Sequence, residues 1–331
     1  MFNKLTFRNF QGETDFPLMQ ALVAASDRAD QIYDSLSLED IQNWCKPSYR
    51  FDPNRNILFA ISQNEGEAPA PVGVSRVGWY TGEAGIHLYS QVSWLHPDWR
   101  KPGIWPAMIQ QNDHRLREIA AEHTDAPLRS LQAWATHKQT QWIAALESTG
   151  YQAVRHFNDM LHSLEDIPDR PLPEGLEVRP VQPEHMRKIW ETQREVQPEL
   201  FETAAEDWTE DKYPRWLENP SHTPHLWQVA WDGDEVVGMV LNRIDEAANA
   251  EREKKRGITE HIFVRRPWRR RGLAGALVAR SLRLLQEQGM DEVELGVDTE
   301  NASGAYRFYQ KMGYQTFNTD IWFRKPVEET E

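Results

Sequence analysis

Three short patterns in the first half of the sequence return, in the same order, in the second half. Gly103 and Gly272 hold the same place in one pair of patterns, 169 residues apart, and Gly150 and Gly313 do so in another, 163 residues apart. Similar offsets at successive points indicate a duplicated domain. The length of 331 residues suits two domains of about 150 to 170 residues each. The matching pairs are 5–10 (LTFRNF) with 176–181 (LEVRPV), 95–105 with 264–274, and 147–152 with 310–315.

The proline-rich stretch between the two copies predicts the domain boundary. Residues 164–175 (LEDIPDRPLPEG) are typical of a semi-rigid linker. We therefore expect a first domain at 1–165, a linker at 166–175 and a second domain at 176–331. Each copy shows a strand, helices, a strand hairpin, another strand, a helix, a strand and a last helix. That order predicts an α/β (α+β) fold of two tandem domains, each a mixed, mostly antiparallel sheet flanked by helices on both faces.

Charge and composition exclude several classes of protein. A formal net charge of −14 argues against a nucleic-acid binder, because phosphate affinity needs a basic face. The single cysteine, Cys45, excludes an intrachain disulfide and is expected to be a structural thiol in a reducing compartment. No apolar run is long enough to span a membrane and residues 1–20 lack a signal-peptide core, so we expect a cytoplasmic protein without a membrane partner. The charged stretch 245–256 is expected to be a solvated loop, and a homodimer stays open.

One segment of the second copy combines a strand, a tight turn and a helix in a way that suits a bound phosphate. Residues 258–264 (ITEHIFV) are rich in β-branched and aromatic residues, which predicts a strand. Apolar residues then recur at helical spacing until Gly289 ends the helix. Between the two elements, Arg269-x-x-Gly272-x-Ala274 lets backbone N–H groups at the positive end of the helix dipole approach an anion.

Two motifs together make the second copy resemble a known family. The turn just described is similar to the coenzyme A signature of the GNAT N-acyltransferase superfamily, Arg/Gln-x-x-Gly-x-Gly/Ala. Residues 298–314 (DTENASGAYRFYQKMGY) are similar to the later motif of that family, since they follow a predicted strand at 292–297 and contain a predicted helix at 303–312. The resemblance spans 176–323 and implies a GNAT fold, acetyl-CoA as the acyl-donor substrate, and an arrangement like that of the tandem GNAT proteins.

The resemblance also implies which residues hold the donor. The Val264 amide would donate to the oxyanion, and the main chain of Phe263 and Val264 would pair with pantetheine. Asn301 would cap a helix or contact the pantetheine arm. The arginines between Arg265 and Arg271 are expected to include one for the 3′-phosphate. The residues expected at the pyrophosphate are Arg269, Arg270, Arg271, Gly272, Leu273, Ala274 and Gly275.

Glu260 is the candidate general base. On the predicted strand, side chains alternate, and in the family a residue four or six places before Val264 often takes this role. Ile258, six places back, cannot serve. The alternative for Glu260 is a solvated or salt-bridged carboxylate, while His261 would face the other side of the strand. A bulge would change this parity. The residues expected to share one face are Ile258, Glu260, Ile262 and Val264.

Tyr309 is the candidate general acid. It lies four residues before Gly313, where the family carries the tyrosine that protonates the departing thiolate. A phenol suits that task because it holds its proton at pH 7 and can hydrogen-bond sulfur. The alternative is a core aromatic, because Tyr309 also belongs to an apolar stripe with Phe308 and Met312. Tyr306 is the second candidate for the acid.

The first copy has lost this chemistry in its sequence. Pro102 and Pro106 remove two N–H groups from its turn, and the indole of Trp105 would crowd the pyrophosphate channel. Leu146 and Gln91 stand where the second copy has its candidate tyrosine and glutamate. We therefore expect a degenerate, non-catalytic first domain. The alternatives are that it completes the acceptor pocket of its neighbour, binds another ligand, or keeps weak coenzyme binding.

These features predict an acyl-CoA-dependent N-acyltransferase, most simply an acetyltransferase that moves acetyl from acetyl-CoA to a primary amine by direct attack in a ternary complex, without a metal. The alternatives are a coenzyme-A-binding sensor or scaffold without turnover, and O-acyl transfer to a hydroxyl. The acceptor is expected to enter by residues 194–224, where carboxylates beside aromatic residues suit a cationic amine. The same pattern is typical of an amphipathic helix with a solvated face.

Overall fold

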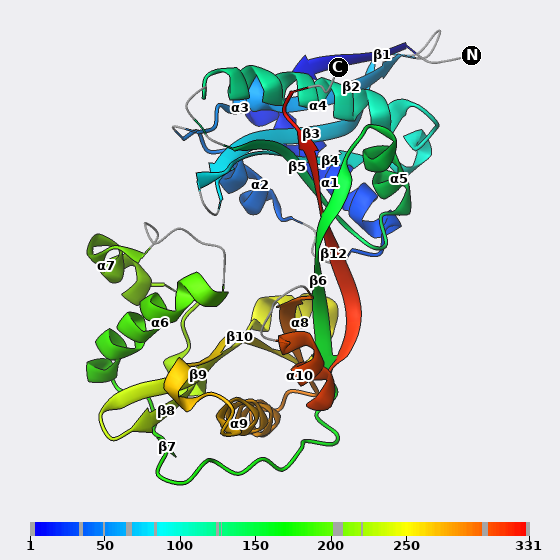
Figure 1. Cartoon of the computed structure of the whole chain (residues 1–331). Helices are drawn as coiled ribbons and strands as arrows, with labels where there is room; N and C mark the ends of the chain where they lie inside the picture. Colours follow the sequence, from blue (N-terminus) through cyan, green and yellow to red (C-terminus); the bar gives the residue numbers. More distant parts are fainter. Residues whose placement is uncertain are drawn as a thin grey trace. The chain divides into compact units, whose positions relative to one another are not determined.

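The computed structural model divides into two compact units (Figure 1). Unit 1 comprises Met1–His156 with Asp320–Glu331, and unit 2 comprises Phe157–Thr319. The structure describes all residues except 1–3, 33–35, 49, 64–67, 83–84, 124–125, 127, 201–207, 220, 300–303 and 329–331, together with the side chains of 197–200 and 251. Among the described residues, no helix has the length and apolar character needed to cross a membrane.

The sheet of unit 1 runs in the order β1-β2-β3-β4-β5-β12. Its paired neighbours are antiparallel except β4 and β5, which are parallel. Helices α1 and α2 pack on one face, and α4 and α5 pack on the other. The strands are β1 Lys4–Asn9, β2 Ile57–Gln63, β3 Ala70–Thr81, β4 His87–Leu95, β5 Arg129–Thr136 and β12 Gln315–Pro326. The helices are α1 Phe16–Ala29, α2 Leu38–Trp44, α3 Pro53–Asn56, α4 Ile104–Ala121 and α5 Thr140–Ser148.

The sheet of unit 2 repeats this plan in the order β6-β11-β10-β9-β8-β7. Here β10 and β11 form the parallel pair. Helix α6 packs on one face, and α9 and α10 contribute to the core on the other. The strands are β6 Gln152–His162, β7 Glu177–Val178, β8 Gln228–Asp232, β9 Glu235–Ile244, β10 Arg256–Val264 and β11 Glu292–Asp298. The helices are α6 Met186–Leu200, α7 Tyr213–Leu217, α8 Glu246–Arg252, α9 Leu273–Glu287 and α10 Ala305–Lys311.

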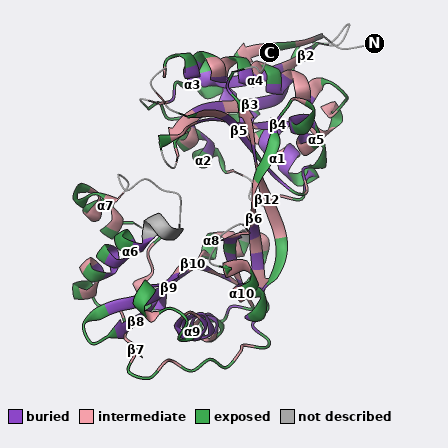
Figure 2. Ribbon diagram, viewed as in Figure 1, coloured by how far each residue is buried: buried purple, intermediate pink, exposed green. Residues whose placement is uncertain are grey.

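These elements confirm the predicted mixed, mostly antiparallel fold. The strand before the turn, the long helix after it and the strand at 292–297 all form close to their predicted limits. Helix α9 is largely buried (Figure 2), as its apolar spacing requires, and Gly289 follows it with a left-handed φ of 83°. The prediction of a loop at 245–256 is wrong in part, because Asp245 accepts a hydrogen bond from the Ala248 N–H and thereby caps α8.

The last strand of each half of the sequence lies in the unit that the other half builds. Strand β6 begins in unit 1, but Phe157–His162 pair with β11 in unit 2. Strand β12 begins in unit 2, but Asp320–Pro326 pair with β5 in unit 1. This exchange covers edges of β5 and β11 that would otherwise be open. The units therefore differ from the predicted ranges: the linker 166–175 lies within unit 2, and the C-terminal strand completes unit 1.

Candidate active site

The turn before α9 presents backbone N–H groups at a helix start that no described side chain caps. Gly272 is the N-cap residue, and its φ of 88° lies in the left-handed region that favours glycine. Leu273 and Gly275 of the first turn are buried, and Ala274 is partly buried. Uncapped amides at a helix start bind anions well, because the helix dipole adds to their hydrogen bonds. The predicted turn therefore has the form that a phosphate group requires.

The end of β10 separates from its neighbour β11. The two strands pair only over Arg256–Ile258 among the described residues, although β10 continues to Val264. On the other side, the Arg265 N–H donates to the Val237 carbonyl at 2.9 Å. Because hydrogen-bonded and non-hydrogen-bonded pairs alternate along antiparallel strands, the main-chain groups of Phe263 face β9 and the Val264 N–H points to the β11 side. An extended molecule between the separated strands would therefore meet the Val264 N–H.

A β-bulge in β10 changes which face its side chains occupy. The register with β9 shifts between Glu260 and Phe263, and His261 has a φ of 45°. Glu260 lies opposite Leu241, which belongs to the core under α6, whereas Val264 belongs to the core under α9. Glu260 and the Val264 side chain are thus on opposite faces. The prediction of one shared face is wrong for the set Ile258, Glu260, Ile262 and Val264.

Glu260 has a partly exposed carboxylate with a fixed partner. Its side chain is 43% exposed, and Arg243 Nε donates to Glu260 Oε1 at 2.8 Å. The salt-bridged state, which was the alternative for this residue, is therefore present. One carboxylate oxygen is taken by Arg243, so a proton from an acceptor amine would reach Glu260 at its other oxygen or through water.

Two histidines lie within electrostatic range of Glu260. Burial lowers the pKa of His261, while the Glu260 charge opposes that shift. Burial also lowers the pKa of His222, as does His261, again against the effect of Glu260. The His222 ring stands edge-on to Trp216 and Trp227, with centroids at 4.7 and 5.1 Å. Sequence reasoning missed His222 because its approach depends on a loop that no periodicity marks.

Tyr309 is a core aromatic residue, as one of its two interpretations required, and its hydroxyl keeps the proton that the other interpretation, a general acid, needs. It is 7% exposed and belongs to the same cluster of buried side chains as Val264, so α10 and the end of β10 share one core. Its ring is edge-on to Phe308 and Tyr314. Among the described residues, its hydroxyl makes no hydrogen bond, and burial raises its pKa. The Tyr306 hydroxyl instead lies 3.3 Å from Thr316 Oγ1.

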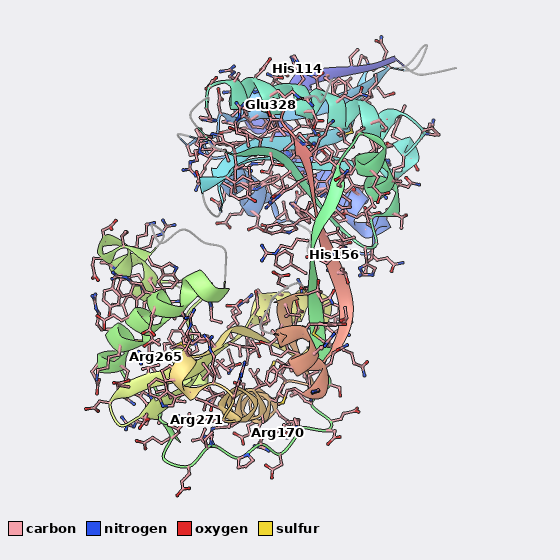
Figure 3. All side chains as sticks on the ribbon, in the orientation of Figure 1. His114, His156, Arg170, Arg265, Arg271 and Glu328 are labelled. Atoms are coloured by element: carbon pink, nitrogen blue, oxygen red, sulfur yellow. The ribbon has the colours of Figure 1, made fainter. Side chains whose placement is uncertain are left out.

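The predicted arginines, of which Arg265 and Arg271 are labelled in Figure 3, differ in how many ion pairs and hydrogen bonds they already form. Arg265 forms ion pairs with Glu195 and Glu235, at 2.9 and 3.1 Å. Arg269 Nε donates to the Val264 carbonyl at 2.8 Å, which fastens the turn to the end of β10. Arg270, with a left-handed φ of 62°, and Arg271 are exposed beside the start of α9. The predicted contact at Asn301 lies outside the described residues.

The acidic segment before β8 is partly neutralised by arginines. Glu210 forms ion pairs with Arg187 and Arg194, at 2.6 and 2.8 Å. Glu195 is held by Arg265 as described above. Since these carboxylates have cationic partners within unit 2, they are not a free anionic surface for a cationic acceptor. Residues 201–207 and 220 of the predicted acceptor segment lie outside the described residues.

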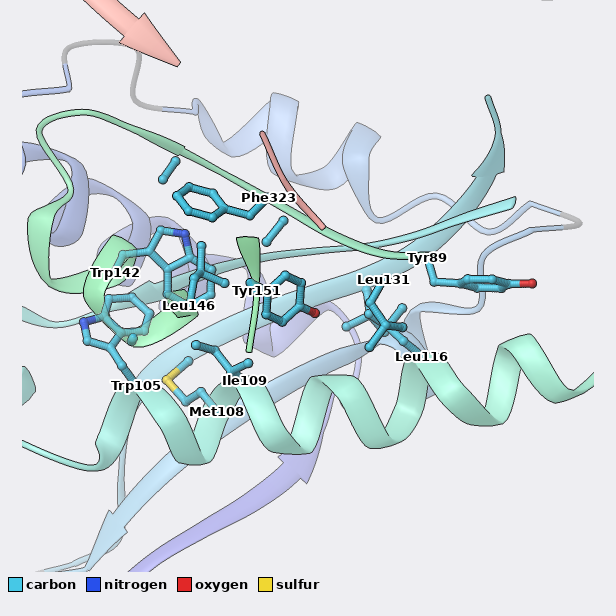
Figure 4. Packing of buried hydrophobic residues seen from close by; sticks show 14 of the residues in the cluster. Tyr89, Trp105, Met108, Ile109, Leu116, Leu131, Trp142, Leu146, Tyr151 and Phe323 are labelled. Atoms are coloured by element: carbon cyan, nitrogen blue, oxygen red, sulfur yellow. The ribbon is translucent and has the colours of Figure 1, made fainter. Parts of the chain in front are cut away.

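The matching region of unit 1 is filled by side chains (Figure 4). Gly103 caps α4 with a φ of 90°, as Gly272 caps α9. The Trp105 ring, however, packs in the core at 4.8 Å from Trp142, rather than crowding the turn as predicted. Trp142 Nε1 donates to the Trp134 carbonyl of β5 at 3.0 Å. Two indoles therefore occupy the core where α4, α5 and β5 meet.

The side chains of unit 1 that replace the candidate base and acid are engaged in its core. Gln91 is buried, and its Nε2 donates to Asp113 at 2.9 Å and to the Tyr151 hydroxyl at 2.7 Å. Leu146 is a buried member of the same hydrophobic cluster as Trp105. Neither residue offers a titratable group to a substrate.

Comparison with known proteins gives a consistent result. Residues 186–314 match the model of the Acetyltransferase (GNAT) family. The chain is 27% identical to a mycothiol acetyltransferase of Frankia casuarinae over 330 residues, covering 91% of this chain and 92% of that protein. It is 24% identical to a mycothiol acetyltransferase of Nocardiopsis dassonvillei, covering 84% of each.

Solved structures share the fold along the whole chain. A GCN5-related N-acetyltransferase from Sphaerobacter thermophilus has a TM-score of 0.71 at 22% identity, covering 99% of this chain and 97% of that one. A tandem GNAT protein from the clavulanic acid biosynthesis pathway has a TM-score of 0.60 at 14% identity, covering 99% of this chain and all of the other.

Proposed function

We propose that this chain is a tandem-domain N-acetyltransferase in which unit 2, whose residues 186–314 match the GNAT family, transfers acetyl from acetyl-CoA to a primary amine and unit 1 does not. The observation that carries this proposal is the pairing of two features in unit 2. Beyond Ile258, β10 separates from β11, and the uncapped start of α9 follows directly after β10. One opening accepts an extended arm and the other an anion, which together describe the shape and charge of a coenzyme A thioester.

The residues of the turn and of β10 divide the donor between them in this proposal. The amides from Arg269 to Gly275 bind the pyrophosphate, helped by the exposed Arg270 and Arg271. The Val264 N–H, which points to the β11 side, donates to the thioester oxygen at the end of the pantetheine arm and stabilises the oxyanion as it forms. Phe263 shapes the site from the α6 side rather than through its main chain, whose groups face β9.

Glu260 and Tyr309 handle the two protons. The amine nitrogen attacks the thioester carbonyl carbon, and Glu260, held by Arg243, takes the proton released from nitrogen directly or through water. As the carbon–sulfur bond breaks, the Tyr309 hydroxyl gives its proton to the sulfur. Tyr309 is suited to this because its burial raises its pKa and keeps it protonated at neutral pH.

Unit 1 keeps the backbone outline of this site but not its chemistry, which supports a non-catalytic role. Gly103 begins α4 without a side-chain cap, and among the described residues β4 pairs with β5 only over His87–Gln91 although it continues to Leu95. Pro106 removes an N–H from the first turn of α4. Trp105 and Trp142 fill the adjoining core, and Gln91 is committed to Asp113 and Tyr151. The acceptor is taken to be a primary amine without further identity, because the residues described in unit 2 do not single out one amine, although both relatives are named for mycothiol.

Calorimetric titration of the full chain with acetyl-CoA tests the proposal through its stoichiometry. We expect one site per chain, lost in Ala274→Trp, whose indole would occupy the first turn of α9. Ala247→Trp, on an exposed position of α8, is the matched control and should bind like the parent. Two sites per chain would contradict the assignment of unit 1, and an absence of binding by the parent would remove the acetyltransferase proposal.

A further inference from the structure

The segment that joins the two halves of the sequence runs along α9. Gln286 Nε2 donates to the Leu164 carbonyl at 2.8 Å. Arg283 donates to the Pro168 carbonyl at 3.3 Å and pairs with Asp169 at 3.0 Å. As the segment proceeds from 164 to 169, its contacts move from the last turn of α9 toward the middle of the helix. The chain is therefore directed to the start of α9, where the turn with Gly272 lies.

The next residue, Arg170, contacts the first turn of α9 through its side chain. Its Cγ and Cδ lie 3.8 Å from the position that a Cβ on Gly275 would occupy, and Gly275 is in the first turn of α9. The Arg170 stem therefore lies against the first turn of α9 at Gly275. The guanidinium extends beyond Cδ from this contact with the first turn of α9. Figure 3 shows Arg170 and Arg271 both beside α9.

The Arg170 guanidinium forms no hydrogen bond or ion pair with the described residues that would stabilise the fold. It is exposed, and no described carboxylate or carbonyl pairs with it. Arg283 and Gln286 already fasten the segment to α9, so the Arg170 charge is not needed as an anchor. By contrast, the nearby Arg265 is neutralised by two glutamates. A guanidinium beside uncapped amides favours a phosphate, which accepts two parallel hydrogen bonds from it.

We propose that Arg170 binds a phosphate of the acyl donor, so that the segment between the two halves supplies a cation to the donor site of unit 2. This inference rests on the proposed function, which assigns the start of α9 to the donor. The shared chemistry is that of a phosphate anion. Its source is either the pyrophosphate or the 3′-phosphate of coenzyme A.

The test compares three donors in the parent and in Arg170→Ala. The donors are acetyl-CoA, acetyl-3′-dephospho-CoA and S-acetylpantetheine, which has no nucleotide. We expect Arg170→Ala to raise the Kd of acetyl-CoA by about 10- to 100-fold, the range for a charge-assisted hydrogen bond, and to leave S-acetylpantetheine unchanged. An equal loss with acetyl-3′-dephospho-CoA assigns Arg170 to the pyrophosphate, and a loss confined to acetyl-CoA assigns it to the 3′-phosphate.

Two controls separate binding from general effects. Arg28→Ala removes another exposed arginine, from α1 in unit 1, and should leave the Kd of acetyl-CoA unchanged. Arg170→Lys keeps the positive charge but not the two parallel N–H donors of the guanidinium. It should lose less affinity for acetyl-CoA than Arg170→Ala. The salt dependence of acetyl-CoA binding should weaken in Arg170→Ala.

The outcomes distinguish this inference from the proposed function. Unchanged acetyl-CoA affinity in Arg170→Ala, or an equal loss with S-acetylpantetheine, would overturn the role of Arg170 while the parent still binds the donor. A parent that binds no acetyl-CoA would remove the proposed function itself, and the inference with it.

Discussion

Burial of Tyr309 keeps its phenol in the protonated form. A tyrosine in water ionises near pH 10. Because burial raises the pKa of Tyr309, the folded protein keeps the proton on this hydroxyl through the whole neutral and mildly alkaline range. A fall in rate caused by its ionisation should therefore begin only above pH 10, and the pH–rate profile of the parent should show no loss from this group below that value.

Removing the Tyr309 hydroxyl isolates its role. We expect Tyr309→Phe to lower kcat by about 100-fold, since a positioned general acid contributes on that order, with the Kd of acetyl-CoA nearly unchanged. Stability should change little, because no described residue bonds the hydroxyl. Tyr306→Phe is the matched control and should keep its rate. Steady-state kinetics measure kcat and thermal melts measure stability. An undiminished kcat in Tyr309→Phe would rule out Tyr309 as the general acid.

Glu260→Gln tests the candidate base at nearly constant shape. The amide cannot accept the amine proton, so we expect the rate to fall most at low pH, where the acceptor amine is most fully protonated. Arg243→Gln is the companion variant, because it removes the partner held at 2.8 Å but keeps the carboxylate. We expect it to retain more activity than Glu260→Gln. A pH–rate profile of Glu260→Gln that matched the parent would remove Glu260 from this role.

At the scale of elements, the close approach of α9 to β9 depends on Gly238. A Cβ at Gly238 would lie 3.0 Å from the Phe263 carbonyl and 3.3 Å from Leu273 and Leu277 of α9. Leu273 is the first residue of the helix whose amides are proposed to bind the donor. A side chain at Gly238 would therefore move both the end of β10 and the start of α9.

Gly238→Ala should weaken donor binding by displacing the end of β10 and the start of α9. We expect a loss in the free energy of unfolding of about 1–3 kcal/mol, as for overpacked cores, and weaker acetyl-CoA binding. Gly78→Ala, on β3 of unit 1, is the control, because a Cβ there meets nothing within 4 Å. Chemical denaturation and calorimetry measure both effects. Equal behaviour of the two variants would contradict this account of α9.

The elements around the turn could be predicted because their signals are local. The strand to Val264, the glycine at 272 and the apolar spacing of α9 each depend on neighbouring residues. The sequence leaves a bulge in this strand open and cannot decide it, because His261 adopts a left-handed φ that its residue type does not require. The pairing of Glu260 with Arg243 depends on the register of β9 with β10, which the bulge itself sets.

At the scale of the whole molecule, the sequence did not predict the exchange of β6 and β12, because the duplication makes the two strands alike. Both strands follow the same pattern, a helix and then Gly-Tyr-Gln, so nothing local distinguishes which sheet each one joins. The repeat does predict two sheets of the same kind, and the structure has them. The domain limits differ for this reason, while the order of elements within each copy follows the prediction.

Lys325 fastens the exchanged strand into unit 1. Its Nζ lies 2.9 Å from Asp113 Oδ2, and the Asp113 side chain is 2% exposed. Asp113 also accepts hydrogen bonds from Gln91 and Tyr151. Without Lys325, a buried carboxylate would lose its cation, which is strongly destabilising.

Lys325→Met should therefore weaken unit 1 selectively. We expect a loss of about 3 kcal/mol in its free energy of unfolding, with faster amide hydrogen exchange in peptides of unit 1 and unchanged exchange in β9 to β11. Arg324→Met is the control on the same strand, since Arg324 donates to the neutral Gln132 at 3.3 Å rather than to a buried carboxylate. Uniform acceleration in both units would contradict a local role for Lys325.

The exchanged strand also bears on how the protein is made. Strand β12 follows every other described element along the chain, so β5 has no neighbour on that side until the sequence of unit 2 has been synthesised. Domains commonly fold in order as the chain emerges, but the first unit here must wait for the final residues of the second half. A nascent chain of this protein thus carries an open β-edge at β5 until β12 emerges and closes it.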